Sequence, residues 1–322
     1  MPFLRDLSAT LLLVAAMTVG LGGGFAAPAR FDASLILWPS IFAQTIVAVG
    51  GLAPTWLSQR DKRVSAMKLL AIHHGAATVP YLAIWLLLPS GIKMSPLAVG
   101  LVSLAIVPTA AGLPAYAAAA RVSPGAITAF ALLAYVTGLV VTPLLALVVF
   151  GEGADIAWLL ASIGIGLVAP ALLGVILGRW VRRIPVPVRS GIVAIGMAIT
   201  TYALASAMRE TLSAGGIGVG LVLAAVTAGA LRVPISALIG TLLAPRRRGL
   251  RAAAAVAAGY KNDALAASIA LQFAGPVGVL PALGSLLSEM VFIVGAAVVA
   301  RSSARRRKGA VTGTKSGTEP DG

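Results

Sequence analysis

Apolar segments of about 20 residues, each long enough to cross a bilayer core as a helix, follow one another from the start of this chain to about residue 300. Helices satisfy their own backbone groups without water, so membrane-spanning helices are the structure that such segments favour. Hydrophobic residues make up 59% of the chain and charged residues 11%, against roughly 45–50% and roughly 25% in soluble domains. The predicted fold class is therefore an all-α polytopic membrane protein. The ten predicted spans are residues 8–27, 35–57, 67–88, 95–119, 125–150, 156–179, 190–208, 216–244, 252–273 and 277–300.

The distribution of basic residues predicts how these spans are oriented. The formal net charge is +15, and the positive charges cluster between spans, where they set topology and contact anionic lipid, so nucleic acid is not an expected partner. If the N-terminus is cytoplasmic, the outer side receives Arg30, Lys93 and Arg209, and nearly all other basic residues fall on the inner side. We therefore expect a multi-pass protein of the cytoplasmic (inner) membrane with both termini in the cytoplasm.

The two ends of the chain need separate interpretation. Leu11–Val19, followed by small residues near Ala27, is also compatible with a cleaved signal peptide, although the charge distribution favours its retention as a span. Residues 303–322 are basic and then rich in Gly, Ser and Thr, which predicts a disordered cytoplasmic tail. Residues 1–302 form the predicted transmembrane domain.

Two of the predicted spans are interrupted at equivalent positions. The fourth is broken around Pro108, Gly112 and Pro114, and the ninth at the polar run that begins at Gly259. Ten spans divide into two sets of five with opposite orientation, which predicts an inverted repeat of about residues 1–151 and 152–302 with the broken helices at the midplane.

Lys261 and Asp263 lie within the second break, inside an otherwise apolar segment. Charged residues at this depth are costly and usually mark a substrate or ion site. An unwound stretch would let the two side chains share a face, so they form either a substrate or coupling site or an internal ion pair that holds the break closed.

Arg232 is a second cation within a predicted span. At 1.5 Å per residue, Arg232 and Lys261 both lie roughly 15–18 Å from the cytoplasmic side. Two cations at one depth indicate either an anion bound between them or pairing with Glu289 in the last span.

The remaining polar candidates lie near the breaks or in the third span. Thr109, Tyr116 and Asn262 could bond a ligand or freed backbone groups. His73 and His74 could move protons, but packing or hydrogen bonding is the simpler role. No cysteine is present, the histidines lack metal-site spacing, and no cofactor is expected.

Two segments, Pro108 to Pro143 and Gly259 to Glu289, resemble the bile acid:sodium symporter family within the bile/arsenite transporter superfamily. A Gly-x-x-Asn-x-x-Leu-Ala-Ala pattern is formed by Gly259, Asn262, Leu265, Ala266 and Ala267. The resemblance implies a core of spans three to five and eight to ten, a panel of spans one, two, six and seven, and two sodium sites beside the crossing of the broken spans.

The departures from this pattern concern the sodium ligands. The family's glutamate and glutamine in the ninth span are replaced by Ala257 and Lys261, and its Ser-Asn pair aligns with Leu113 and Pro114. Our hypothesis is that the Lys261 ammonium replaces a cation and that transport is proton-coupled or uncoupled. The absence of cysteine argues against arsenite export, which relies on a cysteine in the fourth-span break.

The predicted function is secondary transport of a small organic anion by alternating access. A sodium-coupled symporter with other ion ligands is one alternative. A membrane-embedded enzyme would need a nucleophile–base pair or a metal cluster, a sensor would need a signalling domain, and a channel would need a selectivity filter. The sequence does not identify the substrate, the direction of transport or the oligomeric state.

Overall fold

The regular structure of this protein, over the residues that the structure describes, is helical. A computed structural model describes residues 2–28, 34–51, 60–110, 112–113, 116–117, 122, 124–213, 218–246 and 248–313. Its helices, in chain order, are α1 (Pro2–Ala26), α2 (Ser34–Gly50), α3 (Arg60–Ala77), α4 (Val79–Leu87), α5 (Ser90–Lys93), α6 (Pro96–Ile106), α8 (Pro124–Phe150), η2 (Gly151–Gly153), α9 (Ile156–Ile163), η3 (Gly164–Val168), α10 (Ala169–Val181), α11 (Val186–Ser213), α12 (Val219–Leu243), α13 (Arg248–Gly259), α14 (Asp263–Ala274), η4 (Pro276–Val279) and α15 (Leu280–Gly313).

Six helical segments in the described residues are long and apolar enough to cross a membrane. They are Asp61–Leu87, Gly125–Phe150, Ile156–Val181, Val186–Arg209, Val219–Leu243 and Pro276–Gly295. Shorter apolar helices occupy three more predicted spans, at Thr10–Ala26, Leu35–Gly50 and Pro96–Ile106. The prediction of a polytopic helical membrane protein is confirmed. The prediction of ten full-length spans is not confirmed, because interruptions shorten the fourth and split the ninth into α13 and α14.

Local sequence explains where the shortened helices begin and end. Ser95 caps α6 by accepting a hydrogen bond from Ala98 N, and Pro96 occupies the first turn. Asn262 caps α14 in the same way, accepting from Leu265 N at 3.0 Å. Gly275, with φ of +63°, ends α14 in a conformation that residues with a Cβ rarely adopt.

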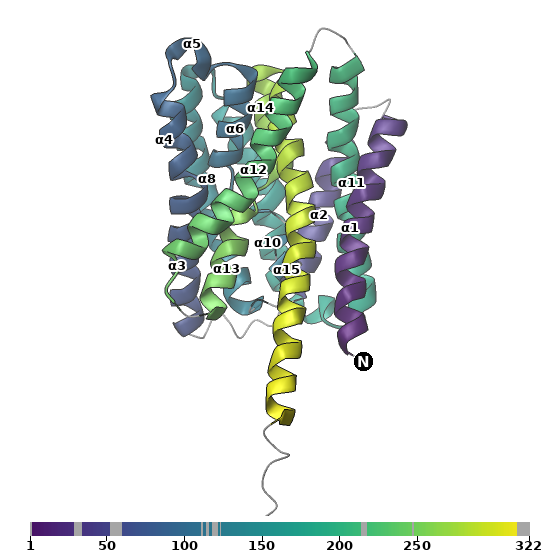
Figure 1. The fold of residues 1–322 in the computed structure, drawn as a ribbon. Helices are drawn as coiled ribbons and strands as arrows, with labels where there is room; N and C mark the ends of the chain where they lie inside the picture. Colours follow the sequence, from purple (N-terminus) through teal and green to yellow (C-terminus); the bar gives the residue numbers. More distant parts are fainter. Residues whose placement is uncertain are drawn as a thin grey trace, which may run out of the picture.

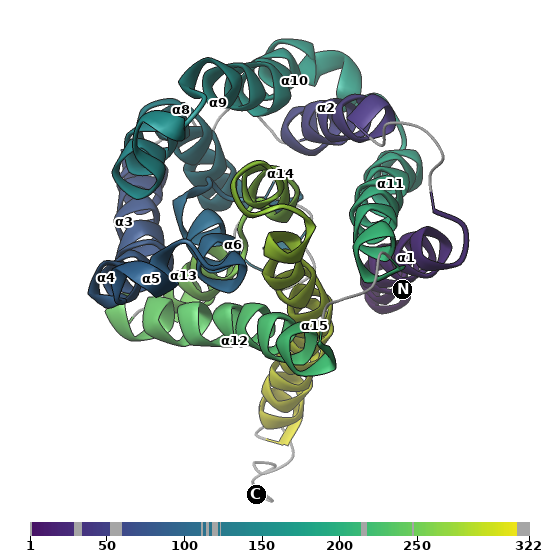
Figure 2. The same ribbon diagram turned by 90° about the horizontal axis from the view of Figure 1, so that it is seen from above.

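The helices pack as two groups (Figure 2). We call α1, α2, α10 and α11 the panel, because they contact one another extensively. The core consists of α3, α4, α6, α8 and α12–α15, with α6 and α14 packed together. The π-helical segment η3 joins α9, which packs on α8 of the core, to α10, which packs on α2 of the panel.

Glycines permit the closest helix contacts within each group. A Cβ added to Gly229 of α12 would overlap the carbonyl of Pro281 in α15, and one added to Gly284 would overlap the carbonyl of Val226. In the panel, Gly174 of α10 faces the backbone of Gly50 in α2, and its four-residue spacing from Gly178 is typical of closely packed membrane helices.

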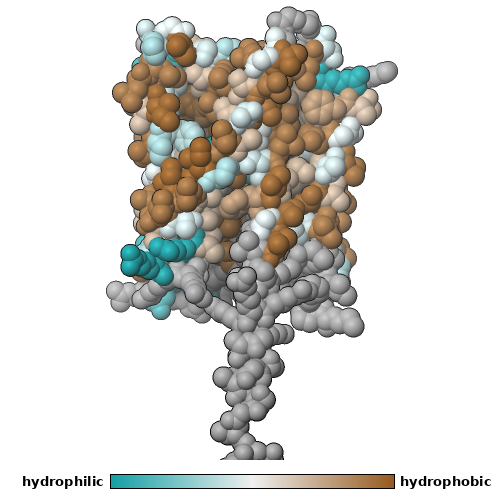
Figure 3. Space-filling view, in the orientation of Figure 1, coloured by the Kyte–Doolittle hydropathy of each residue, from teal (hydrophilic) through white to brown (hydrophobic). Residues whose placement is uncertain are grey.

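Apolar side chains cover the middle of the surface in Figure 3, and hydrophilic residues gather at its ends, for example where α3 begins. The helices α1, α3 and α13 begin, and α15 ends, at the same end of the molecule (Figure 1). The predicted tail from residue 303 overlaps the end of α15, and residues 314–322 lie outside the described residues.

Candidate functional site

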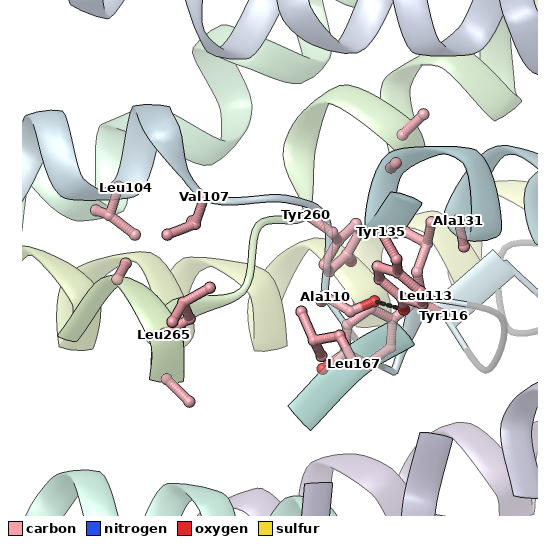
Figure 4. Close-up of a cluster of buried hydrophobic side chains, with 14 of the residues drawn as sticks. Leu104, Val107, Ala110, Leu113, Tyr116, Ala131, Tyr135, Leu167, Tyr260 and Leu265 are labelled. Atoms are coloured by element: carbon pink, nitrogen blue, oxygen red, sulfur yellow. Dashed lines mark hydrogen bonds between the residues drawn. The ribbon is translucent and has the colours of Figure 1, made fainter. Parts of the chain in front are cut away.

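The two interrupted helices meet at the centre of the core. After α6 ends at Ile106, residues 107–110 continue without helical structure, and residues 260–262 separate α13 from α14. Asn262 N donates to the Pro108 carbonyl at 2.9 Å, and Thr109 Oγ1 donates to the Tyr260 carbonyl at 3.0 Å. Figure 4 shows the segment after Val107 passing beside the segment that carries Tyr260. We call residues 107–110 and 259–262 the crossing.

The crossing exposes carbonyl groups that a continuous helix would have satisfied, and protein donors take their place. At the end of α6 and in residues 107–110, five carbonyls accept from protein donors. The Lys261 ammonium donates to the carbonyls of Ala105 and Val107, and Thr142 Oγ1 donates to that of Ile106. Asn262 N donates to the Pro108 carbonyl, and the Tyr135 hydroxyl donates to the Ala110 carbonyl. Around the second interruption, His73 Nδ1 bonds Ala257, Arg232 Nη2 donates to Gly259, and Thr109 Oγ1 donates to Tyr260. The buried polar residues of the crossing thus serve first to satisfy two helix ends.

Lys261 caps the C-terminal end of α6. Its ammonium donates to Thr78 Oγ1 at 3.1 Å, to Ala105 O at 3.0 Å and to Val107 O at 2.9 Å, which uses its three protons. The side chain is 1% exposed, and the helix dipole places partial negative charge at this end of α6. The interpretation of Lys261 and Asp263 as an internal ion pair is wrong, because the ammonium contacts carbonyl and hydroxyl oxygens instead.

Arg232 caps the C-terminal end of α13. Its Nη2 atom donates to Gly259 O at 3.0 Å and to Ser285 Oγ at 2.6 Å, and lies 3.4 Å from Glu289 Oε1. The same carboxylate oxygen accepts from Lys261 N at 3.3 Å. The predicted pairing of Arg232 with Glu289 is therefore present, and it ties α12 and α15 to the crossing.

A small cavity lies between the panel and the crossing. Its volume is about 40 Å³, room for roughly one water molecule. The residues around it are Ile41, Gln44, Ala110, Gly112, Tyr116, Met197, Thr200, Lys261, Asn262, Asp263, Ala264, Leu286 and Glu289. The two oxygens of Asp263 and the amide oxygen of Gln44 are buried and have no hydrogen-bond partner, so three acceptors beside this space lack a donor.

The other predicted residues fall into two sets. Tyr116 and Asn262 line the cavity, and the Tyr116 hydroxyl lies 3.6 Å from Met197 Sδ in the panel. Thr109, His73 and His74 do not line it. Because a carbonyl oxygen only accepts, His73 donates from Nδ1 to Ala257 O, and His74 Nδ1 contacts Thr78 Oγ1.

Pro108 and Gly259 lie at the two helix ends, and Gly112 lies in a turn beside the cavity. Pro114 lies outside the described residues.

Three residues of the site, Gln44, Thr78 and Ser285, were not predicted from the sequence. Gln44 is a polar residue in an apolar helix, which is itself a signal of a buried role. Ser285 precedes Glu289 by four residues and so shares its helix face. Thr78 belongs to the site because the Lys261 side chain reaches it, and no pattern in the sequence around Thr78 indicates that contact.

A scan against protein-family models finds no match to this chain, and a search of curated proteins also finds none. The resemblance to bile acid:sodium symporters therefore remains an expectation from the residues quoted above.

Proposed function

We propose that this protein is a secondary active transporter that moves a small organic anion across the membrane by alternating access and without sodium. The observation that carries the proposal is the Lys261 ammonium, held by three oxygens at the end of an interrupted helix. Interrupted helices near the midplane are where secondary transporters bind coupling ions, through freed backbone carbonyls. Here a covalently attached cation occupies such a group of carbonyls.

The arrangement of panel and core supports alternating access. The cavity between them, at about 40 Å³, is far below the roughly 300–1,000 Å³ of sites for small molecules. A substrate would enter only if the panel and the crossing move apart. In this proposal the structure represents a closed state. The matching positions of the two helix interruptions are explained, in the same proposal, by an inverted repeat of ten spans.

The choice of an anion rests on charge. Four charged residues are buried at and around the crossing: Arg232, Lys261, Asp263 and Glu289. Both cations are hydrogen-bonded within the protein, so they would attract an anion through space and not as direct ligands. The N-terminal end of α14, where Ala264 lines the cavity, adds partial positive charge.

The end of the molecule at which α1 begins and α15 ends is the proposed cytoplasmic side (Figure 1). The basic residues in the first turn of α3, Arg60, Lys62 and Arg63, and those around the start of α13 lie at this end, which the positive-inside rule favours as the cytoplasmic side. We propose a multi-pass protein of the cytoplasmic membrane with both termini inside.

The test is uptake of radiolabelled small carboxylates and sulfonates into proteoliposomes, in sodium and in potassium buffers. We expect at least one anion to be taken up equally in both salts. Uptake that requires sodium would overturn the replacement of the cation by Lys261, and no uptake of any anion would overturn the transport proposal.

The Lys261→Ala variant tests the role of the ammonium directly. It leaves Thr78 Oγ1, Ala105 O and Val107 O around a vacated position, so we expect uptake to fall to background and to recover partly with millimolar propylammonium. Lys68→Ala, at an exposed position on α3, is the matched control. Unaltered uptake by Lys261→Ala would place the essential cation elsewhere.

A further inference from the structure

Asp263 lines the cavity as a buried carboxylate without a donor. It is 6% exposed, and neither oxygen accepts a hydrogen bond. The hydroxyl of the nearby Ser285 accepts from Arg232 and does not meet hydrogen-bond geometry with Asp263. A buried carboxylate in this position needs a proton, a cation or a hydrogen-bond donor.

Gln44 presents a second acceptor from the opposite wall. Its Nε2 atom donates to Thr200 Oγ1 at 3.4 Å, while Thr200 Oγ1 donates to Gly196 O at 2.9 Å. Because the Thr200 proton is already committed, this hydroxyl can only accept from Gln44, and that fixes the orientation of the amide. The Gln44 Oε1 atom, buried and without a partner, is therefore left as an acceptor beside the cavity.

The charged and titratable groups around Asp263 do not supply the missing donor. The three protons of Lys261 are directed to Thr78 and α6, and Tyr116 is directed to Met197. Glu289 on α15 accepts from Arg232 and from Lys261 N. Arg232 on α12 does not line the cavity, and its Nη1 atom has no acceptor.

We propose that Asp263 binds the coupling proton of this transporter, and that Gln44 of the panel is the acceptor that the protonated carboxyl faces when panel and core close. The proposal rests on the transport function proposed above and identifies its coupling ion. A proton from one side binds a carboxylate oxygen, travels with the core in the closed state, and leaves to water on the other side.

The charge balance links this proton to an anion. With Asp263 ionised, the two cations and two carboxylates at the crossing sum to zero. With Asp263 protonated the sum is one positive charge, which a bound monoanion neutralises. The closed, dehydrated state is thus favoured when both the proton and the anion are bound or when neither is bound. Symport requires this coupling between the two ligands.

The geometry favours a proton over sodium at this position. Sodium in interrupted helices is usually held by freed carbonyls. The carbonyls of Ala105–Pro108, at the end of α6 and the start of the crossing, and those of Gly259 and Tyr260 each already accept from a protein donor. Among the buried side-chain atoms of the described cavity lining, the acceptors without a hydrogen-bond partner are the oxygens of Asp263 and Gln44, fewer than the six or so oxygens that hard cations prefer.

Transport measurements with Asp263→Asn test the coupling. The amide is neutral at every pH, so we expect anion exchange across proteoliposomes to persist while accumulation driven by a pH gradient is lost. For the wild type, one pH unit should drive about tenfold accumulation of a monoanion carried with one proton. The probes are small sulfonates, which stay ionised and do not leak as neutral acids. Asp155→Asn is the control, because Asp155 caps α9 and asparagine caps helices equally well.

Thermal unfolding of the purified protein gives an independent measurement. We expect the wild type and Asp155→Asn to gain stability as pH falls from 8 to 5, and Asp263→Asn to lose this dependence. Sodium-specific stabilisation, absent in potassium and in Asp263→Asn, would overturn the proton in favour of sodium. Equal pH dependence in all three proteins, or pH-driven accumulation by Asp263→Asn, would also overturn the inference. A wild type that transports no anion but shows the expected pH dependence would overturn only the proposed transport function.

Discussion

Lys261 and Arg232 perform the same task at two different helix ends. Lys261, from the second interruption, satisfies carbonyls at the end of α6, and Arg232, from α12, satisfies the carbonyl at the end of α13. Each places a full positive charge where a helix dipole is negative. A buried charge that would be costly in the membrane is thereby stabilised by the carbonyl groups at a helix C-terminal end, which lack hydrogen-bond donors of their own.

Removing the Lys261 ammonium should therefore destabilise the protein strongly. Lys261→Met keeps an unbranched side chain that is one atom shorter, and it removes the ammonium donor from two carbonyls and a hydroxyl. At about 1–3 kcal/mol for each unsatisfied buried group, we expect a loss of roughly 3 kcal/mol or more of unfolding free energy. Denaturant unfolding in detergent measures it, with the exposed Lys68→Met as control. A loss equal to that of the control would mean that water or lipid satisfies these carbonyls.

Arg232 and Glu289 should behave as a coupled pair. Arg232→Met leaves the Glu289 carboxylate buried with only the Lys261 N–H, and we expect a cost of about 3–5 kcal/mol. Combining it with Glu289→Gln should cost less than the sum of the two single changes, with a coupling energy of about 1–3 kcal/mol. The double-mutant cycle is read from unfolding midpoints, and strictly additive losses would show that the 3.4 Å contact contributes no net stability.

At the scale of elements, the sequence predicted where helices are interrupted better than what their side chains contact. Proline and glycine act on the local backbone, so Pro108 and Gly259 marked the ends of α6 and α13. The partners of Lys261 are Thr78, Ala105 and Val107, more than 150 residues away in the chain. Such contacts depend on how two distant segments cross, and backbone carbonyls are present at every position, so composition could not identify them.

The contact between α12 and α15 depends on Gly229 and Gly284. A Cβ at Gly284 would overlap the Val226 carbonyl, so Gly284→Ala should force the two backbones apart and cost about 1–3 kcal/mol. Because these helices carry Arg232 and Glu289, the separation should also weaken their ion pair. Gly295→Ala, where an added Cβ meets nothing within 4 Å, is the control on the same helix and should be neutral. Equal melting temperatures for both variants would contradict this description of the contact.

At the scale of the whole molecule, α9, η3 and α10 form a helical connection that passes from the core to the panel (Figure 2), and α1 of the panel also packs on α15 of the core. The π-helical η3 lies between the part that packs on α8 and the part that packs on α2. Irregular turns of this kind often mark functional positions. In the proposed transport cycle, this connection lets the two groups keep their own packing while the cavity between them opens.

A cross-link between panel and core should stop this motion. Ile41 of α2 and Leu286 of α15 line opposite sides of the cavity, and the chain contains no cysteine of its own. In Ile41→Cys with Leu286→Cys, a short thiol-specific cross-linker should abolish uptake of the anion identified in the liposome screen, and cleavage of the linker should restore it. Gly23→Cys with Tyr202→Cys joins two neighbouring positions within the panel and should leave uptake intact when cross-linked. The reason for expecting uptake to stop is that a space of about 40 Å³ does not admit an organic anion while its two walls stay joined. Continued uptake by the cross-linked Ile41–Leu286 pair would mean that the substrate crosses without separation of panel and core.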